Sequence, residues 1–176
     1  FWRKCYKGIY RANLYLEKIE GIDDASQSFK ARTTGEAKFL RAKFYFDLVR
    51  LFGNVPYIDH TLGASEYYTV EQVGPELIFP FIISDLEDAI AALPSSVSSN
   101  EIGRVTKGAA QALLARTYLF QNDASKMSEV ATLSEAVIQS GEYALLPSFG
   151  EIWTRDGEWS SESVFEITYS ENSSSD

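Results

Sequence analysis

Hydrophobic and polar positions alternate with a helical period along most of residues 1–141. Apolar residues recur every three or four positions from Trp2 to Ile19, and Gly21 follows them. This pattern predicts five helices, which we place at about residues 2–20, 34–52, 80–93, 107–121 and 126–140.

The second of these segments carries the strongest signal. Apolar residues fall on two faces, one with Ala37, Leu40, Phe44, Leu48 and Leu51, the other with Phe39, Ala42, Phe46 and Val49. The narrow face between them carries Glu36, Lys43, Asp47 and Arg50, spaced so that they can pair along the surface. A helix with two apolar faces needs neighbours on both sides.

Local signals predict where the helices begin and end. Residues 23–30 read as a polar loop, and Thr33 or Thr34 is the expected N-cap of the second helix, with Glu36 placed for a capping box. Gly53 and Pro56 end that helix. Since Pro75 and Pro80 do not both fit comfortably inside one helix, we start the third helix with Pro80 in its first turn.

Thr106 is the expected N-cap of the fourth helix, and Gly141 closes the fifth. Beyond Gly141 the pattern changes, and three stretches look extended: residues 143–145, 152–153 and 164–169. We therefore divide the chain into a helical region, 1–141, and the start of a loop- and strand-rich lobe, 142–176.

The second and fourth helices resemble each other. The residues Gly35, Ala37, Leu40, Ala42, Tyr45 and Phe46 align with Gly108, Ala110, Leu113, Ala115, Tyr118 and Leu119, about 73 positions further on. Two hairpins of about 34 residues with a few loop residues would give this period. The predicted fold is mainly α, with tetratricopeptide-like helical hairpins stacked as a solenoid and a small loop- or β-rich C-terminal portion.

Five segments in collinear order resemble the SusD/RagB family of glycan-binding outer-membrane lipoproteins. They are residues 35–56, 83–94, 103–110, 115–119 and 137–145. The resemblance runs from about Trp2 to about Tyr169, and members of that family are much longer. It implies that this chain is a fragment, and that a cleaved signal and a lipid-modified cysteine lie outside it.

Composition and charge exclude some classes of function. The 176 residues carry a net charge of −9, and Arg3-Lys4 is the only adjacent pair of cations that stands out, so we expect no nucleic-acid partner. No stretch reaches the roughly 20 apolar residues of a membrane span. The single cysteine, Cys5, reads as a small core residue.

Little in the sequence points to catalysis. There is one histidine, and no phosphate loop, spaced Cys cluster or metal-binding pattern, so we expect no metal and no cofactor. Paired carboxylates could serve a glycosidase. We read Asp23-Asp24 as a turn, Asp85 with Glu87 and Asp88 as the solvent side of a helix, and Asp156 with Glu158 as a solvated loop near tryptophans.

Sugar binding needs aromatic faces that stack on pyranose rings, with polar groups at their edges. Aromatic side chains in predicted loops, with polar residues beside them, are therefore the candidate ligand contacts: Trp153, Trp159, Tyr57, Tyr67, Tyr68, Asp59 and His60. Each of them could instead be a local core or loop residue. Trp2, Tyr6, Tyr10, Phe44, Tyr45 and Phe46 are assigned to the core because of their helical spacing. Arg41 and Arg104 are expected to brace the fold through buried or bridging ion pairs.

The resemblance implies a non-catalytic, surface-exposed, lipid-anchored protein of the outer membrane. Such a protein captures an oligosaccharide, or another nutrient such as a peptide, and passes it to a SusC-like TonB-dependent transporter. A helical-repeat adaptor that binds peptides or proteins is the alternative. A glycoside hydrolase that uses Asp156 or Glu158 is a third hypothesis.

Overall fold

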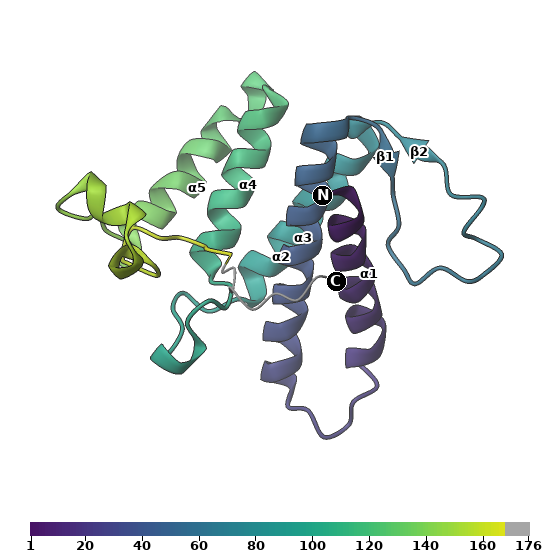
Figure 1. Cartoon of the computed structure of the whole chain (residues 1–176), viewed down its shortest axis with the longest axis horizontal. Helices are drawn as coiled ribbons and strands as arrows, with labels where there is room; N and C mark the ends of the chain where they lie inside the picture. Colours follow the sequence, from purple (N-terminus) through teal and green to yellow (C-terminus); the bar gives the residue numbers. More distant parts are fainter. Residues whose placement is uncertain (168–176) are drawn as a thin grey trace.

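Five helices follow one another along the chain, each packed against the next, in a computed structural model that describes residues 1–167 (Figure 1). Their bounds are α1 Trp2–Ile19, α2 Gln27–Phe52, α3 Pro75–Ala92, α4 Lys107–Gln121 and α5 Met127–Gln139. The predicted mainly helical, hairpin-based fold is confirmed.

The remaining elements are short. Strands β1 Val55–Pro56 and β2 Gln72–Val73 pair antiparallel, with Val55 opposite Val73. Turns of 3-10 helix span Ser99–Glu101, Ala124–Lys126, Phe149–Trp153 and Arg155–Gly157. The long loop between β1 and β2 lies beside α1, whereas the last two 3-10 turns, in yellow, lie at the opposite end of the molecule (Figure 1).

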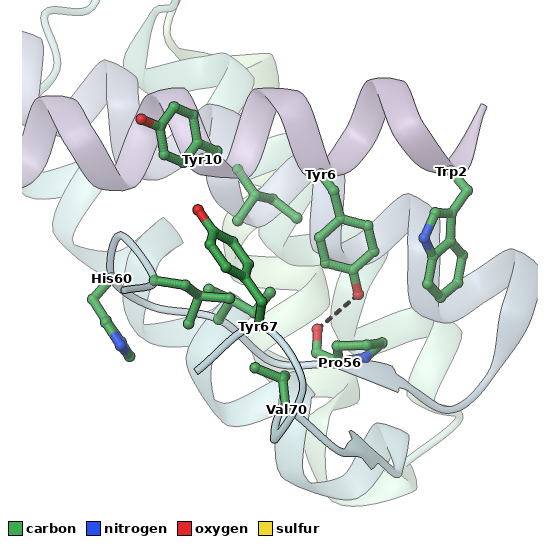
Figure 2. A pocket seen from close by; sticks show the side chains of 10 residues that line it. Trp2, Tyr6, Tyr10, Pro56, His60, Tyr67 and Val70 are labelled. Carbon is green, nitrogen blue, oxygen red and sulfur yellow. Dashed lines mark hydrogen bonds between the residues drawn. The ribbon is translucent and has the colours of Figure 1, made fainter. Parts of the chain in front are cut away.

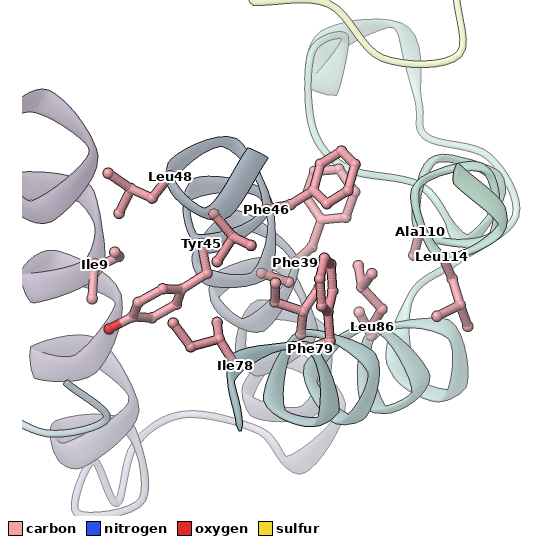
Figure 3. Close-up of a cluster of buried hydrophobic side chains, with 14 of the residues drawn as sticks. Ile9, Phe39, Tyr45, Phe46, Leu48, Ile78, Phe79, Leu86, Ala110 and Leu114 are labelled. Carbon is pink, nitrogen blue, oxygen red and sulfur yellow. The ribbon is translucent and has the colours of Figure 1, made fainter. Parts of the chain in front are cut away.

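Helix α2 is the centre of the core. It packs against α1 on one side and α3 on the other, as its two apolar faces predict. Figure 3 shows Leu48 near Ile9 of α1, while Phe39 and Phe46 lie on the side of Phe79 and of the helix α4. The match is incomplete at Leu40, which is 36% exposed and lines a groove of about 500 Å³ between α1 and α2.

Helix α2 begins seven residues earlier than predicted. Ser26 is its N-cap, with a side-chain oxygen that accepts a hydrogen bond from the backbone N–H of Phe29 at 3.2 Å. The expected capping box does not form, because the Thr33 hydroxyl donates to the Phe29 carbonyl and Glu36 binds Arg104 instead. No Gly or Pro interrupts residues 27–33, so the helix extends through them.

Helix α3 also begins earlier than predicted, and it contains both prolines. Pro75 occupies its first turn, where a missing N–H costs nothing. Pro80 lies inside the helix on its exposed side, so that the Glu76 carbonyl, which loses its N–H partner, can reach water. The prediction that Pro80 marks the first turn is therefore wrong.

The repeat seen in the sequence has a counterpart in the packing. A Cβ on Gly35 of α2 would lie 3.0 Å from Ala92, where α3 ends, and one on Gly108 of α4 would lie 2.6 Å from Tyr143, just after α5. Both glycines therefore permit a close approach to the end of the following helix. Thr106 caps α4 as predicted.

Charged side chains tie the helices together. Arg104 binds the Glu36 carboxylate through two nitrogens, at 2.9 and 2.6 Å, and the predicted bracing role is confirmed. The placement of Asp85 on the solvent side of α3 is wrong, because this residue is only 7% exposed and pairs with Arg41. Asp88, on the exposed side, pairs with Lys38.

No strand forms in residues 142–167, where three extended stretches were predicted. Ile152 and Trp153 belong to a 3-10 turn rather than a strand. Residues 143–145 and 164–167 are irregular, and Ala144 N–H donates to the Ser161 carbonyl at 2.9 Å. Residues 168 and 169 of the last predicted strand lie outside the described residues.

Candidate functional site

The loop between β1 and β2 is held against α1 by buried polar side chains. Asn13 is fully buried, and its amide nitrogen donates to the carbonyls of Ile58 at 2.9 Å and His60 at 3.1 Å. Tyr45 accepts a hydrogen bond from the Ile58 N–H at 2.7 Å and donates to the Ile58 carbonyl at 2.9 Å. These contacts satisfy loop backbone groups that would otherwise be costly to bury.

Two further contacts with α1 hold the same loop, at Pro56 and at Thr61. The Tyr6 hydroxyl donates to the Pro56 carbonyl at 2.7 Å. The Glu17 carboxylate accepts hydrogen bonds from the N–H and hydroxyl of Thr61, at 2.6 and 2.7 Å, and this lowers the pKa of Glu17. The loop is thus fixed to α1 at its beginning and near its middle.

A groove of about 450 Å³ lies between α1 and this loop. Its lining is mainly aromatic and aliphatic, with few polar atoms. The residues that line it are Trp2, Tyr6, Ile9, Tyr10, Pro56, Ile58, His60, Leu62, Tyr67 and Val70. Figure 2 shows Trp2, Tyr6 and Tyr10 on the α1 side, with the Tyr67 ring rising from the loop opposite them.

His60 lines the groove, and each of its two ring nitrogens contacts a carboxylate of the loop. Nδ1 lies 2.8 Å from Asp59 and Nε2 lies 3.1 Å from Glu66, and the ring is turned away from the aromatic side chains of α1 (Figure 2). The hydrogen bonds that the imidazole ring makes to the carboxylates of Asp59 and then Glu66 raise the pKa of His60. The pKa of Glu66 is lowered, mainly because it accepts the Gly63 N–H.

Only some of the predicted ligand contacts meet in this groove. Tyr67 and His60 line it, and Asp59 binds His60 at its edge. Tyr57 stacks on Phe81 instead, with ring centres 3.9 Å apart, and burial raises its pKa. Tyr68 is 96% exposed and does not line the groove.

The two predicted tryptophans do not line the aromatic groove, and Trp153 ends the 3-10 turn Phe149–Trp153. Trp153 is 76% exposed and packs edge-on against Phe149, at 6.0 Å between ring centres. Trp159 has a left-handed backbone, φ +58°, and its indole covers Gly103 in a polar groove of about 240 Å³. The Tyr143 and Thr106 hydroxyls, 2.7 Å apart, line the same polar groove.

Sequence reasoning missed the α1 side of the aromatic groove. Tyr10 was assigned to the core but is 50% exposed, and Trp2 and Tyr6 are only half-buried. Helical spacing shows that these three residues share a face, but it cannot distinguish the centre of a buried face from its edge. The basic residue directly after each of them is the signal that marks the edge.

Within residues 1–167 no three or more His, Cys, Asp or Glu side chains are grouped so that they could hold a metal ion. No described helix is long and apolar enough to cross a membrane.

Comparison with known proteins identifies relatives across the chain. The model of a SusD-like family, described as starch-binding and associating with the outer membrane, matches residues 1–119. SusD-like protein P25 of Formosa agariphila is 25% identical over 97% of this chain, which is 32% of the relative's length. The starch-binding protein SusD of Bacteroides thetaiotaomicron is 31% identical over 90% of this chain and 28% of its own length.

A solved structure has the same fold. It is surface glycan-binding protein A from Bacteroides thetaiotaomicron in complex with laminarihexaose, with a TM-score of 0.86 and 30% identity. The match covers 96% of this chain and 34% of that protein. The chain thus spans about a third, or less, of the length of the relatives it matches here.

Proposed function

This chain belongs to the SusD-like family, and we propose that it forms part of a cell-surface protein that binds an oligosaccharide in the groove between α1 and the β1–β2 loop. The observation that carries the proposal is the groove's lining. Trp2, Tyr6 and Tyr10 lie on one side and Tyr67 on the other, so that sugar rings could stack between two aromatic walls.

A fixed loop favours binding. Because Asn13 and Tyr45 hold the loop backbone in place, little conformational entropy is lost when a ligand enters. The backbone of Ile58 and His60, which line the groove, is then set before the ligand arrives. Solved relatives described as binding laminarin or laminarihexaose support a sugar ligand.

We propose a binding role and no enzymatic one. The carboxylates beside the groove already have hydrogen-bond partners in the loop: Glu17 accepts from Thr61, Glu66 from Gly63, and Asp59 pairs with His60. Asp156 and Glu158 are exposed, in and directly after the 3-10 turn Arg155–Gly157, and do not line the groove. Two carboxylates facing one glycosidic bond, as hydrolysis needs, are not assembled at this groove within residues 1–167.

Family membership also supports a proposal about the full-length protein, of which this chain is a part. We propose that the whole protein is anchored to the outer membrane by a lipid outside this segment. It would pass its ligand to a SusC-like TonB-dependent transporter. Co-purification of such a transporter with the full-length protein tests this; recovery of no outer-membrane transporter would contradict it.

A helical-repeat adaptor that binds peptides is the alternative. It would also use a groove beside stacked helices. The aromatic lining fits sugar rings as well as it fits apolar side chains, so the ligand panel must contain both. Tight binding of unrelated peptides, with no sugar bound, would favour the adaptor.

Isothermal titration calorimetry of the full-length protein against a polysaccharide panel tests the site. We expect Tyr10→Ala and Tyr67→Ala each to weaken binding by about tenfold, the effect of one lost stacking contact. The pair Trp153→Ala and Trp159→Ala tests the tryptophan contacts predicted from the sequence. Leu145→Ala, at an exposed position away from the groove, is the control. Binding unchanged in both tyrosine variants would overturn the assignment of the groove.

A further inference from the structure

The polar groove beside Trp159 forms where three separate parts of the chain meet. They are the loop that precedes α4, the residues just after α5 and the segment that follows the last 3-10 turn. Its volume is about 240 Å³, compared with about 450 Å³ for the aromatic groove between α1 and the β1–β2 loop. Hydroxyl groups dominate its polar lining: Ser95, Ser96, Thr106, Tyr143, Ser160, Ser161 and Ser163. The two grooves share no lining residue, so they are separate sites.

Some of these hydroxyls hold the walls of the polar groove together. The Thr106 and Tyr143 hydroxyl oxygens lie 2.7 Å apart, and Thr106 also accepts the Ala109 N–H at the start of α4. The Ser161 hydroxyl donates to the Ala144 carbonyl at 3.0 Å. These bonds connect the segment after α5 both to α4 and to the last described segment. The walls are therefore fixed by contacts within the chain.

The other serine side chains are available to a ligand. The hydroxyls of Ser95, Ser96, Ser160 and Ser163 make no hydrogen bond to any residue within 1–167. The indole N–H of Trp159 also has no acceptor in the described part of the chain. A hydroxyl both donates and accepts, whereas an indole N–H only donates. The groove thus presents several hydrogen-bonding groups beside one large aromatic ring.

Trp159 is held at this position by a backbone conformation that is unusual for an aromatic residue. Its φ of +58° lies in the left-handed region, which is costly for residues with a Cβ. Its backbone N–H donates to the Glu166 carboxylate at 3.0 Å. The indole lies against Gly103, where an added Cβ would be 3.1 Å from the ring. Strained residues of this kind concentrate at ligand sites, where the strain sets the position of a side chain in advance.

An indole beside free hydroxyls suits a neutral sugar. Trp159 is half-buried and lines the groove, so part of its ring can contact the apolar face of a pyranose. The sugar hydroxyls would then meet the serine hydroxyls and the exposed carboxylate of Glu142. An anionic sugar is disfavoured by Glu142, and Arg104 in the lining already binds Glu36 through two nitrogens.

We propose that the polar groove is a second carbohydrate site, which holds one neutral sugar ring, at the end or a branch of a glycan, against Trp159. Its volume lies below the range of about 300–1,000 Å³ that is typical of pockets for drug-sized ligands, so a single ring fits better than a chain. The proposal shares the sugar-binding role proposed above. It depends on different residues, so either site can fail without the other.

The three tryptophans of this chain provide separate reporters for a test. Trp2 lines the aromatic groove, Trp159 lines the polar groove and Trp153 lines neither. In the full-length protein labelled with fluorotryptophan, single Trp→Phe variants assign the fluorine NMR signal of each. The probes are the methyl glycosides of glucose, galactose, mannose and xylose, in both anomers. With at least one probe, we expect the Trp159 signal to shift and saturate in the millimolar range, while the Trp153 signal stays in place.

A pair of serine substitutions tests the hydrogen-bonding groups. Ser160→Ala/Ser163→Ala removes two hydroxyls that have no hydrogen-bond partner among residues 1–167, so the fold should persist. We expect the affinity measured at Trp159 to fall about tenfold, as the loss of two hydrogen bonds would give. The control Ser134→Ala/Ser148→Ala removes two exposed hydroxyls outside both grooves and should bind as before. Circular dichroism establishes that both variants fold.

Three results would overturn the second site. They are a Trp159 signal that no glycoside moves, an equal shift with glycerol at the same concentration of hydroxyl groups, and an unchanged affinity in Ser160→Ala/Ser163→Ala. Failure of the proposed function looks different, because Trp2 and the Tyr10→Ala variant report on the aromatic groove. A sugar that moves Trp159 but not Trp2, and binds Tyr10→Ala normally, would support the polar groove alone. The reverse would overturn the second site and leave the proposed function intact.

Discussion

Arg41 binds the carboxylate of Asp85 through two hydrogen bonds, Nε to Oδ2 at 2.7 Å and Nη2 to Oδ1 at 2.8 Å. This pair joins α2 to α3 in a largely buried position. Arg41 also donates from Nη1 to Oδ1 of Asn13 at 2.9 Å, and Asn13 in turn holds the β1–β2 loop. One continuous network therefore connects three helices to the loop that forms the groove.

Breaking this pair should destabilise the whole fold. Arg41→Met leaves Asp85 charged and buried without its partner, which typically costs about 3–5 kcal/mol of unfolding free energy. The double variant Arg41→Met/Asp85→Leu should recover most of that loss, since no uncompensated charge remains. Urea denaturation followed by circular dichroism measures both. A single variant that loses less than about 1 kcal/mol would show that the pair is not essential.

Asn13→Leu tests the link between the network and the loop. The carbonyls of Ile58 and His60 lose their donor, and the Arg41 nitrogen loses an acceptor, so we expect a loss of about 2–3 kcal/mol. Hydrogen exchange should speed up between β1 and β2 more than in α4. Asn54→Ala, at an exposed position, is the control. Equal exchange in both variants would contradict the role given to Asn13.

Gly8 marks a close contact between α1 and α2. A Cβ at this position would overlap the Phe44 ring, so Gly8→Ala should destabilise the protein by about 1–3 kcal/mol despite the better helix propensity of alanine. Phe44→Leu in the same chain should restore part of the loss, because the shorter side chain leaves space. The melting temperatures of the single and double variants provide the comparison, and a stabilising Gly8→Ala would refute the contact.

His60 should make the stability of the β1–β2 loop depend on pH. Its folded pKa is raised by Asp59 and Glu66 above the unfolded value of about 6.5. The contribution of protonated His60 is therefore complete below about pH 6.5 and is lost as pH rises through the folded pKa. Above the folded pKa of His60, amide exchange around Gly63 should accelerate more than the intrinsic pH dependence of exchange predicts. His60→Gln should remove this extra acceleration.

Since the chain has a single histidine, one NMR resonance reports its titration directly. A measured pKa at or below 6.5 would show that the two carboxylates do not stabilise the imidazolium. The matched variant Glu66→Gln should lower the pKa, because one of the two charged partners is then neutral.

The helices could be predicted from the sequence because their signals are local. Apolar period, Thr106 at an N-cap and Gly141 after α5 each depend on neighbours within one or two turns. Two helix starts were misplaced, because the polar residues 27–33 and the internal Pro80 are each compatible with a helix in their actual surroundings. Residues 27–33 join α2, where Lys30 also donates to the Glu20 carbonyl at the end of α1, and Pro80 is tolerated because its side of α3 faces water.

The candidate site was only partly predictable. Tyr67 and His60 were identified from their loop context, and the structure brings them to one groove. Tyr57 looked equivalent in sequence, yet it stacks on Phe81, a residue from a later helix. Tyr10 looked like a core residue, although it faces the groove.

By itself, the sequence determined the helical hairpins, the two-faced packing of α2, the internal repeat and the family. These follow from periodicity and from patterns of nearby residues. Only the tertiary structure decided which aromatic side chains line the groove and which charged side chains pair between helices. Burial and pairing depend on chain segments far apart in sequence: Arg41 and Asp85 meet across 44 residues, and Glu17 and Thr61 meet across another 44.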